Sequence, residues 1–360
     1  MIATLPVPAP PPPGTTPPPV TDHTGAAPSI AVSSPSVPVA QPPPAIATTA
    51  PPVSQAAPGT QAVPVTQAAP VTEASIEPAR SFAVHTEFHI EAATEQQILD
   101  HVPAAGLPDP TVFRFRPNPQ ILVLDFASLL DQGRMLNRVA ALVEKNGLPH
   151  DRLLDDGELD SAIRANGDTV ETFYYGHDYG VPELIRFFAL AARDNVRLVT
   201  QEDRLAQLLR QGGWFEPNSH AALISIPQIG ADKHVTREAR ATILHHELSH
   251  GEYFTNSAYA AFTHRFWTQT LTAGERDRIR RHLRSLGYDT GLSEVMENEA
   301  QAYLMFTDGA EFFTPDMIGM SKARLADLRN GFWKTMPPGW LRDSLGQSLS
   351  ANRAAVTAHP

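Results

Sequence analysis

The chain has 360 residues, enough for one large domain or two smaller ones, and a formal net charge of −11. A net acidic chain is a poor nucleic-acid binder, so no nucleic-acid partner is expected. The chain also has no cysteine. This excludes disulfides, thiolate metal sites and a cysteine nucleophile, so any metal must be held by histidines and carboxylates.

The first 80 residues differ in composition from the rest of the chain. Residues 1–80 hold 21 of the 34 prolines and only four charged residues. Such a segment has few large apolar side chains to bury, which predicts a disordered, proline-rich tail or spacer. Its proline runs are alternatively ligands for proline-reading modules. We therefore expect a disordered tail at 1–80, a folded domain at 81–345 and a flexible C-terminal tail at 346–360.

No segment has the pattern of a membrane span. The most apolar stretch, residues 184–192, contains Arg186 and is too short to cross a bilayer. Prolines also interrupt each apolar stretch near residue 1 that a secretory signal would need. The sequence leaves the compartment open: the lack of a signal pattern as written favours the cytoplasm, whereas a proline-rich leader is typical of exported or envelope-associated proteins. It leaves the oligomeric state open.

The first half of the folded region mixes strands and helices. Apolar runs rich in β-branched residues predict strands, and apolar residues at helical spacing predict helices. The strands are expected at 111–116, 120–126, 196–200 and 221–227, and the helices at 129–145, 182–192 and 202–210. The acidic stretch from Asp155 lacks the ligand pattern of a calcium loop and is expected to be a turn into a helix that carries Leu159 and Ile163.

The second half is mostly helical. Thr236 is a suitable N-cap for the first of its helices. The helices are expected at 237–253, 257–271, 273–286, 293–306 and 321–335. Strands and helices followed by helices alone predict an α+β fold in which a sheet edge borders a helical lobe.

The run from His245 to His250 contains the pattern H-E-x-x-H. On a helix, His246 and His250 lie one turn apart on one face and can chelate one Zn²⁺, and Glu247 can take the proton of a water held by that metal. His245 points away from this face, so we expect it to support or pack rather than to bind metal. The alternative without a metal site is an ordinary helix whose histidines are surface or core residues.

A catalytic zinc needs a third protein ligand and an open position for water. At this point the sequence resembles the zincin metallopeptidases. Their metzincin branch is excluded, because Tyr253 and Asn256 stand where its glycine and third histidine would be. The gluzincin branch instead takes a glutamate from a downstream helix, which typically reads N-E-x-x-x-D or E-x-x-A-D.

The helix expected at 293–306 offers three glutamates for this role, about fifty residues after the H-E-x-x-H pattern. Glu299 fits the resemblance best, Glu297 is the main competitor, and Glu294 is the third candidate. The acidic residue usual at the fourth position after the ligand is replaced by Tyr303. The support for a metal-bound histidine would therefore be a neutral hydrogen bond.

The resemblance implies a zincin-like catalytic domain with one Zn²⁺ per chain and a peptide or protein substrate. Glu247 would be the general base, and Tyr303, Tyr253 or His264 would stabilise the oxyanion. In zinc peptidases an edge strand beside the motif helix pairs with extended substrate, and residues 223–226 are expected to be that strand. The alternative function is a catalytically inactive zincin-like domain that acts as a zinc-stabilised binding or scaffold module, its metal closed by a fourth ligand.

Overall fold

A computed structural model describes residues 86–102, 108–215 and 219–358, and the expected tail at 1–80 lies outside these residues. Its sheet has five strands in the order β1-β2-β3-β5-β4. The strands are β1 (Ile90–Ala93), β2 (Thr111–Phe115), β3 (Ile121–Phe126), β4 (His177–Gly180) and β5 (Ala222–Pro227). β1 pairs parallel with β2 and β3 parallel with β5, whereas β2–β3 and β4–β5 are antiparallel.

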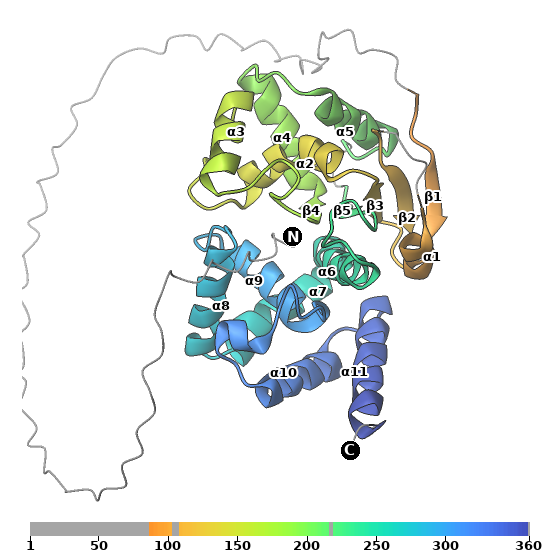
Figure 1. Cartoon of the computed structure of the whole chain (residues 1–360), viewed down its shortest axis with the longest axis vertical. Coiled ribbons are helices and arrows are strands. Elements are labelled where there is room, and N and C mark those ends of the chain that lie inside the picture. Colours follow the sequence, from red (N-terminus) through yellow and green to blue (C-terminus); the bar gives the residue numbers. More distant parts are fainter. Residues whose placement is uncertain (1–85, 103–107, 216–218, 359–360) are drawn as a thin grey trace, which may run out of the picture. The chain divides into compact units, whose positions relative to one another are not determined.

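Helices cover both faces of this sheet (Figure 1). On one face lie α2 (Leu129–Val143), α3 (Asp156–Ala165), α4 (Val181–Arg193) and α5 (Thr200–Gln211). On the other face α6 (Arg237–Thr255) contacts β3, β4 and β5, and α1 (Glu95–Asp100) contacts α6. All six residues of β3 and of β5 are buried, which explains why these two strands read as continuous apolar runs.

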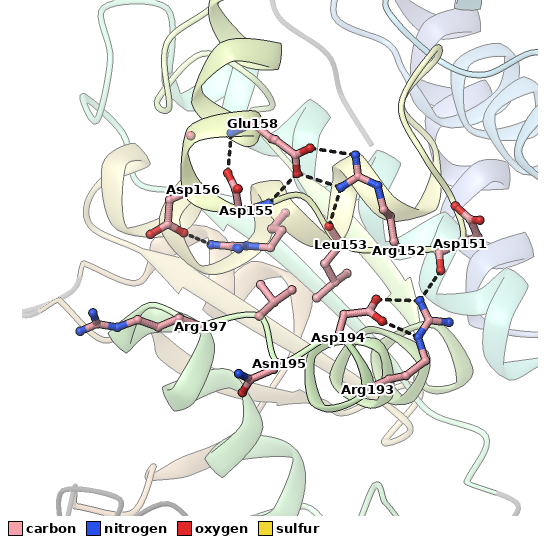
Figure 2. Close-up of a pocket in the computed structure, with 13 residues that line it drawn as sticks. Asp151, Arg152, Leu153, Asp155, Asp156, Glu158, Arg193, Asp194, Asn195 and Arg197 are labelled. Carbon is pink, nitrogen blue, oxygen red and sulfur yellow. Dashed lines mark hydrogen bonds and ion pairs between the residues drawn. The ribbon is translucent and has the colours of Figure 1, made fainter.

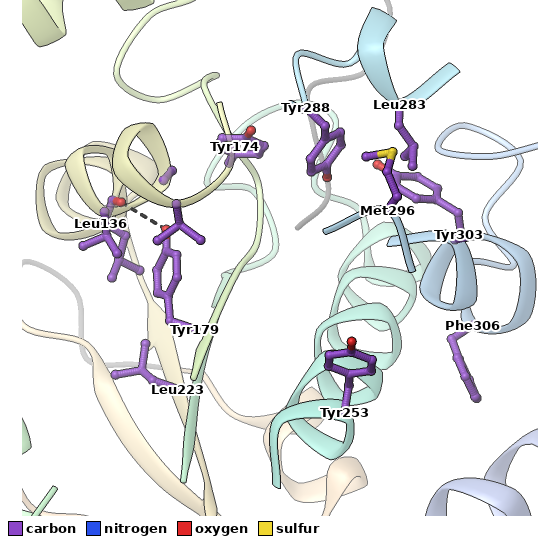
Figure 3. Close-up of a cluster of buried hydrophobic side chains, with 14 of the residues drawn as sticks. Leu136, Tyr174, Tyr179, Leu223, Tyr253, Leu283, Tyr288, Met296, Tyr303 and Phe306 are labelled. Atoms are coloured by element: carbon purple, nitrogen blue, oxygen red, sulfur yellow. Dashed lines mark hydrogen bonds between the residues drawn. The ribbon is translucent and has the colours of Figure 1, made fainter. Parts of the chain in front are cut away.

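The sheet separates two hydrophobic cores. Along β5, Leu223 packs into the core under α2 and α4, while Ile224 and Ile226 pack into the core under α6. The alternation follows from the period of two in a strand. The larger core continues into the C-terminal helices, where Tyr288 and Tyr303 join it (Figure 3).

The C-terminal part is helical. Its elements are α7 (Ser257–Arg265), a π turn (Phe266–Thr270), α8 (Ala273–Ser285), α9 (Ser293–Gln301), a second π turn (Ala302–Phe306), a 3-10 turn (Pro315–Ile318), α10 (Lys322–Thr335) and α11 (Trp340–Ala358). The expected mixture of a small sheet with a helical C-terminal lobe is therefore confirmed at the level of fold class. No helix among the described residues is long and apolar enough to cross a membrane.

A buried ion pair fastens α6 to the sheet. Arg240 donates to both carboxylate oxygens of Asp125, at 2.8 and 3.0 Å, and both side chains are almost fully buried. The same guanidinium donates to the carbonyl oxygens of Pro227 and Ile98. One side chain thus joins α1, β3 and the end of β5 to the helix that carries the H-E-x-x-H pattern.

Two sequence-based expectations were wrong. Residues 196–200 form no strand, because α5 already begins at Thr200. The helix α11 extends across the expected boundary at 345, and its Leu341, Leu345 and Leu349 form a buried stripe at helical spacing. The segment 223–226 is not an edge strand, because β5 is hydrogen-bonded on both sides and β4 takes the edge position.

Candidate metal centre

The two motif histidines lie side by side on α6. The Thr236 side chain caps the helix by accepting from the Ala239 amide at 3.1 Å. Leu244 and Leu248 pack toward the sheet, which turns His246 and His250 to the opposite side, and both imidazoles are fully buried. Their Nε2 atoms are 3.0 Å apart. The helical spacing thus brings two ring nitrogens to one point.

Glu299 of α9 faces the same point. Its two carboxylate oxygens are 3.8 Å from Nε2 of His246 and 3.7 Å from Nε2 of His250. Burial raises the pKa of this carboxyl to about 8. Two ligands that are each about 2.0–2.1 Å from one tetrahedral zinc ion lie about 3.3 Å apart, so these three side chains need to move only a few tenths of an ångström to hold one.

The tautomer of His246 follows from its second ring nitrogen. Nδ1 is 2.8 Å from the Thr307 hydroxyl, and that hydroxyl donates its single proton to the carbonyl oxygen of Ala302 at 3.0 Å. Nδ1 of His246 must therefore be the donor, which leaves the lone pair of a neutral ring on Nε2. The π turn Ala302–Phe306 delivers Thr307 to this position at the end of α9.

A carboxylate lies close to Nδ1 of His250, the ring nitrogen on the side away from His246. Oδ2 of Asp178, on β4, is 3.6 Å from Nδ1 of His250. A carboxylate at this distance favours a proton on Nδ1 and hence a lone pair on Nε2. Two lone pairs 3.0 Å apart repel each other, so a cation between the two rings would stabilise this arrangement. The residues present therefore fit a divalent metal.

Glu247 lies beside this cluster. It is fully buried, and the carboxylates of Glu247 and Asp178 and the ring of His250 offer ligand atoms within 4.8 Å of one another. The backbone of Gly176 packs directly on the Glu247 side chain, where an added Cβ would lie only 2.2 Å from Oε1. Because residue 176 has no side chain, the Glu247 carboxylate has room to occupy this position.

The other two glutamates of α9 do not face the histidines. Glu297 is within 3.0 Å of the His264 ring, and His264 is 59% exposed. Glu294 is exposed. Of the three candidates for the third ligand, only Glu299 is grouped with His246 and His250 in the described part of the chain.

The remaining site candidates have distinct positions. The His245 ring is directed to α11, where its Nε2 is 3.1 Å from the Ser344 hydroxyl, and it packs against Phe306. Tyr303 packs its ring edge-on against His246, with ring centroids 4.9 Å apart. Tyr253 is buried on α6, and burial raises the pKa of its phenol above the ordinary value. The sequence reading missed Thr307, Asp178 and Gly176, which no motif marks.

Two cavities differ in their relation to this cluster. One of about 930 Å³ is lined by charged side chains that mostly pair with each other, such as Arg152 with Glu158 and Arg193 with Asp194 (Figure 2). It contains none of the predicted site residues. A smaller cavity of about 190 Å³ is lined by Asp178 and Glu299 and opens onto the cluster, so the smaller one is the candidate substrate site.

Comparison of the chain with protein-family models, with curated proteins and with solved structures finds no match. The chemistry of the site is therefore argued from its own residues.

Proposed function

We propose that this protein is a zinc-dependent peptidase of the zincin type, with His246, His250 and Glu299 as the metal ligands. The observation that carries the proposal is the convergence of two Nε2 atoms, 3.0 Å apart, with a glutamate at 3.7–3.8 Å from both. The adjacent buried Glu247 adds a base to this ligand set. A zinc ion bound there would lower the pKa of a coordinated water and polarise the scissile carbonyl.

The side chains of the chain supply the remaining steps. Glu247 takes the proton of the attacking water and returns it to the amine that leaves. The Thr307 hydroxyl accepts from Nδ1–H of His246, and the Asp178 carboxylate lies 3.6 Å from Nδ1 of His250, so that both rings would present the lone pair of Nε2 to a metal. Tyr303, which packs on His246, could donate to the developing oxyanion.

The substrate would be a peptide that approaches along β4. β4 is the edge strand of the sheet and contacts α6, so an extended peptide added there would run past Glu247. This is the relation between edge strand and motif helix that zinc peptidases use, with β4 in the place expected for residues 223–226.

Metal analysis and turnover test the proposal in two stages. The parent should hold one zinc per chain after dialysis, a His246→Ala/His250→Ala variant none, and the matched control His245→Ala one. Glu247→Gln should keep its zinc and lose nearly all cleavage of a peptide mixture analysed by mass spectrometry. Absence of zinc from the parent would refute the site, and full cleavage by Glu247→Gln would refute the role of that residue. Zinc without cleavage in the parent would favour the scaffold function.

A further inference from the structure

Carboxylates are the largest group of side chains that line the cavity beside the candidate metal centre. We name it the acidic pocket, a cavity of about 190 Å³. Five acids and one arginine line it, which gives −4 (−5 + 1) when all are ionised. The charged residues are Glu144, Asp178, Glu183, Glu294, Glu299 and Arg186. Arg186 is exposed and directs its guanidinium to the carbonyl oxygen of His150 at 2.7 Å, so it does not neutralise the interior.

Glu144 is the residue in this pocket that points to a ligand. Its side chain is buried, with 3% of the residue exposed, and Oε1 has no hydrogen-bond partner among the described residues. The Tyr174 hydroxyl lies beside this carboxylate and can donate one hydrogen bond to it, which leaves further acceptor positions of the carboxylate open. A buried carboxylate oxygen without a donor is costly, and a ligand that brings N–H groups would satisfy it.

The surroundings of Glu144 favour a cation. Glu144 caps the C-terminus of α2, so the negative end of that helix dipole opens onto the pocket. Glu144, Asp178, Glu183 and Glu299 line one small cavity, so ionising all four carboxyls there is costly. A positively charged ligand would offset this cost of placing several carboxylates together.

The size and position of the pocket restrict that ligand. Pockets for drug-sized ligands are about 300–1,000 Å³, so about 190 Å³ holds little more than one amino-acid residue. Apart from these charged residues and Asn298, the lining is apolar, with Val143, Phe254, Leu292 and Val295, and suits an apolar side chain of the ligand. Because Glu299 borders both the pocket and the two histidines, a charge bound there lies next to the reacting carbonyl.

Two groups of a peptide could supply the positive charge, and they differ in their distance from the carbonyl carbon that reacts. The amino nitrogen of an N-terminal residue is about 2.5 Å from the carbonyl carbon of the same residue, since two covalent bonds of about 1.5 Å separate them. A lysine ammonium lies farther away, at the end of a four-carbon stem. Asp178 lies beside the proposed base, with its ligand atom and those of Glu247 and His250 within 4.8 Å of one another, and this position matches the shorter reach.

We propose that the acidic pocket binds the α-ammonium group of a peptide's N-terminal residue, with Glu144 and Asp178 as acceptors, and that the protein is an aminopeptidase. This inference rests on the proposed zinc peptidase function. In the reaction, water adds across the first peptide bond: its oxygen bonds to the carbonyl carbon, the C–N bond breaks, and the leaving nitrogen receives the proton. The products are one amino acid and a peptide shortened by one residue.

Binding tests the inference without turnover. Leucinamide, which has a free amine, should bind zinc-loaded Glu247→Gln protein in a calorimetric titration, whereas N-acetyl-leucinamide should not. Adding Glu144→Gln should weaken leucinamide binding about 10- to 100-fold, the usual effect of losing a hydrogen bond to a charged group. The matched control is Glu238→Gln, an exposed residue of α6, which should bind as before. Equal binding of both amides would overturn the inference.

Turnover then distinguishes the sources of charge. The parent should release the first residue from a peptide with a free amine and leave its N-acetylated form intact, even when that form contains an internal lysine. In Glu144→Gln the KM should rise about 10- to 100-fold with a smaller change in kcat. Cleavage of acetylated peptides after lysine, or two zinc ions per chain with the second lost in Glu144→Gln, would overturn the inference but leave the peptidase function standing. Absence of zinc or of any cleavage would instead count against the proposed function.

Discussion

The close approach of Gly176 to Glu247 allows a sharp test of the assigned base. In Gly176→Ala the new Cβ would lie 2.2 Å from Oε1, 2.8 Å from Cδ and 3.0 Å from Cγ of Glu247, the three heavy atoms nearest to it. Ordinary contact begins at 3.4 Å, so the carboxylate must move by about 1.2 Å (3.4 − 2.2). All three of these atoms belong to Glu247, and no atom of the three proposed metal ligands is among them.

The expected effect is large on turnover and small on stability. A misplacement of about 1 Å in a catalytic group can cost about 100-fold in rate, equivalent to about 2.7 kcal/mol of activation free energy. The atom that must move is the end of a flexible side chain, so overpacking should lower the free energy of unfolding by only about 1–3 kcal/mol. The variant should therefore fold, keep one zinc and lose about 100-fold in kcat.

The assay combines kcat on a free-amine peptide with zinc content and urea unfolding. Gly331→Ala is the matched control, because nothing lies within 4 Å of a Cβ added at this position of α10. It should keep full activity and gain about 0.5–1 kcal/mol of stability, as glycine does when replaced by alanine inside a helix. If Gly176→Ala turns over at the parental rate with zinc bound, Glu247 is not the base and the reasoning from its position fails.

Three further predictions concern the support of the site and of the fold. Thr307→Val keeps the shape of the side chain but removes the acceptor for Nδ1–H of His246, and should weaken zinc binding about 10- to 100-fold in a competition titration with a chelator. The hydrogen bonds from Arg324 hold the pKa of Glu275 at about 2, below its ordinary 4.5, so this pair stabilises the fold above about pH 4.5 and the contribution is lost as the pH falls toward 2. Because Arg324 is partly exposed, Glu275→Gln should cost at most about 1 kcal/mol at pH 6 and nothing at pH 2, measured by urea unfolding, and an equal cost at both would contradict this. Arg240→Met leaves its buried carboxylate partner without a counter-charge and should lower the free energy of unfolding by about 3–5 kcal/mol.

The parts of the fold that local periodicity determines could be predicted from the sequence. Residues 129–143 and 322–335 form helices close to their expected bounds, because apolar stripes and capping residues specify them locally. The spacing of His246 and His250 needs only a helix to bring their rings together. Glu299 required the resemblance to a known pattern, since its distance from these rings depends on how two helices pack.

The parts that depend on pairing between distant segments could not be predicted. β4 has the sequence His-Asp-Tyr-Gly, which has little strand propensity, and it is extended because β5 pairs with it. The order of the strands follows from this pairing, so the edge strand was assigned to the wrong segment. Asp178 on β4 and Gly176 just before it reach the candidate metal centre through this pairing, and for this reason no spacing in the sequence linked them to His250 or Glu247.

The π turn at Ala302–Phe306 makes the winding of one helix part of the candidate metal centre. Successive residues of an α-helix are rotated by about 100° around its axis. A π turn accommodates one residue more than an α-helical turn, so α-helical winding over the same residues would rotate Thr307 by about that angle away from His246. Glu299 precedes the turn and would keep its place on α9. The extra residue in this turn therefore sets the direction in which Thr307 points: the same side chains on a helix that is α-helical throughout would present the carboxylate but lose the hydroxyl.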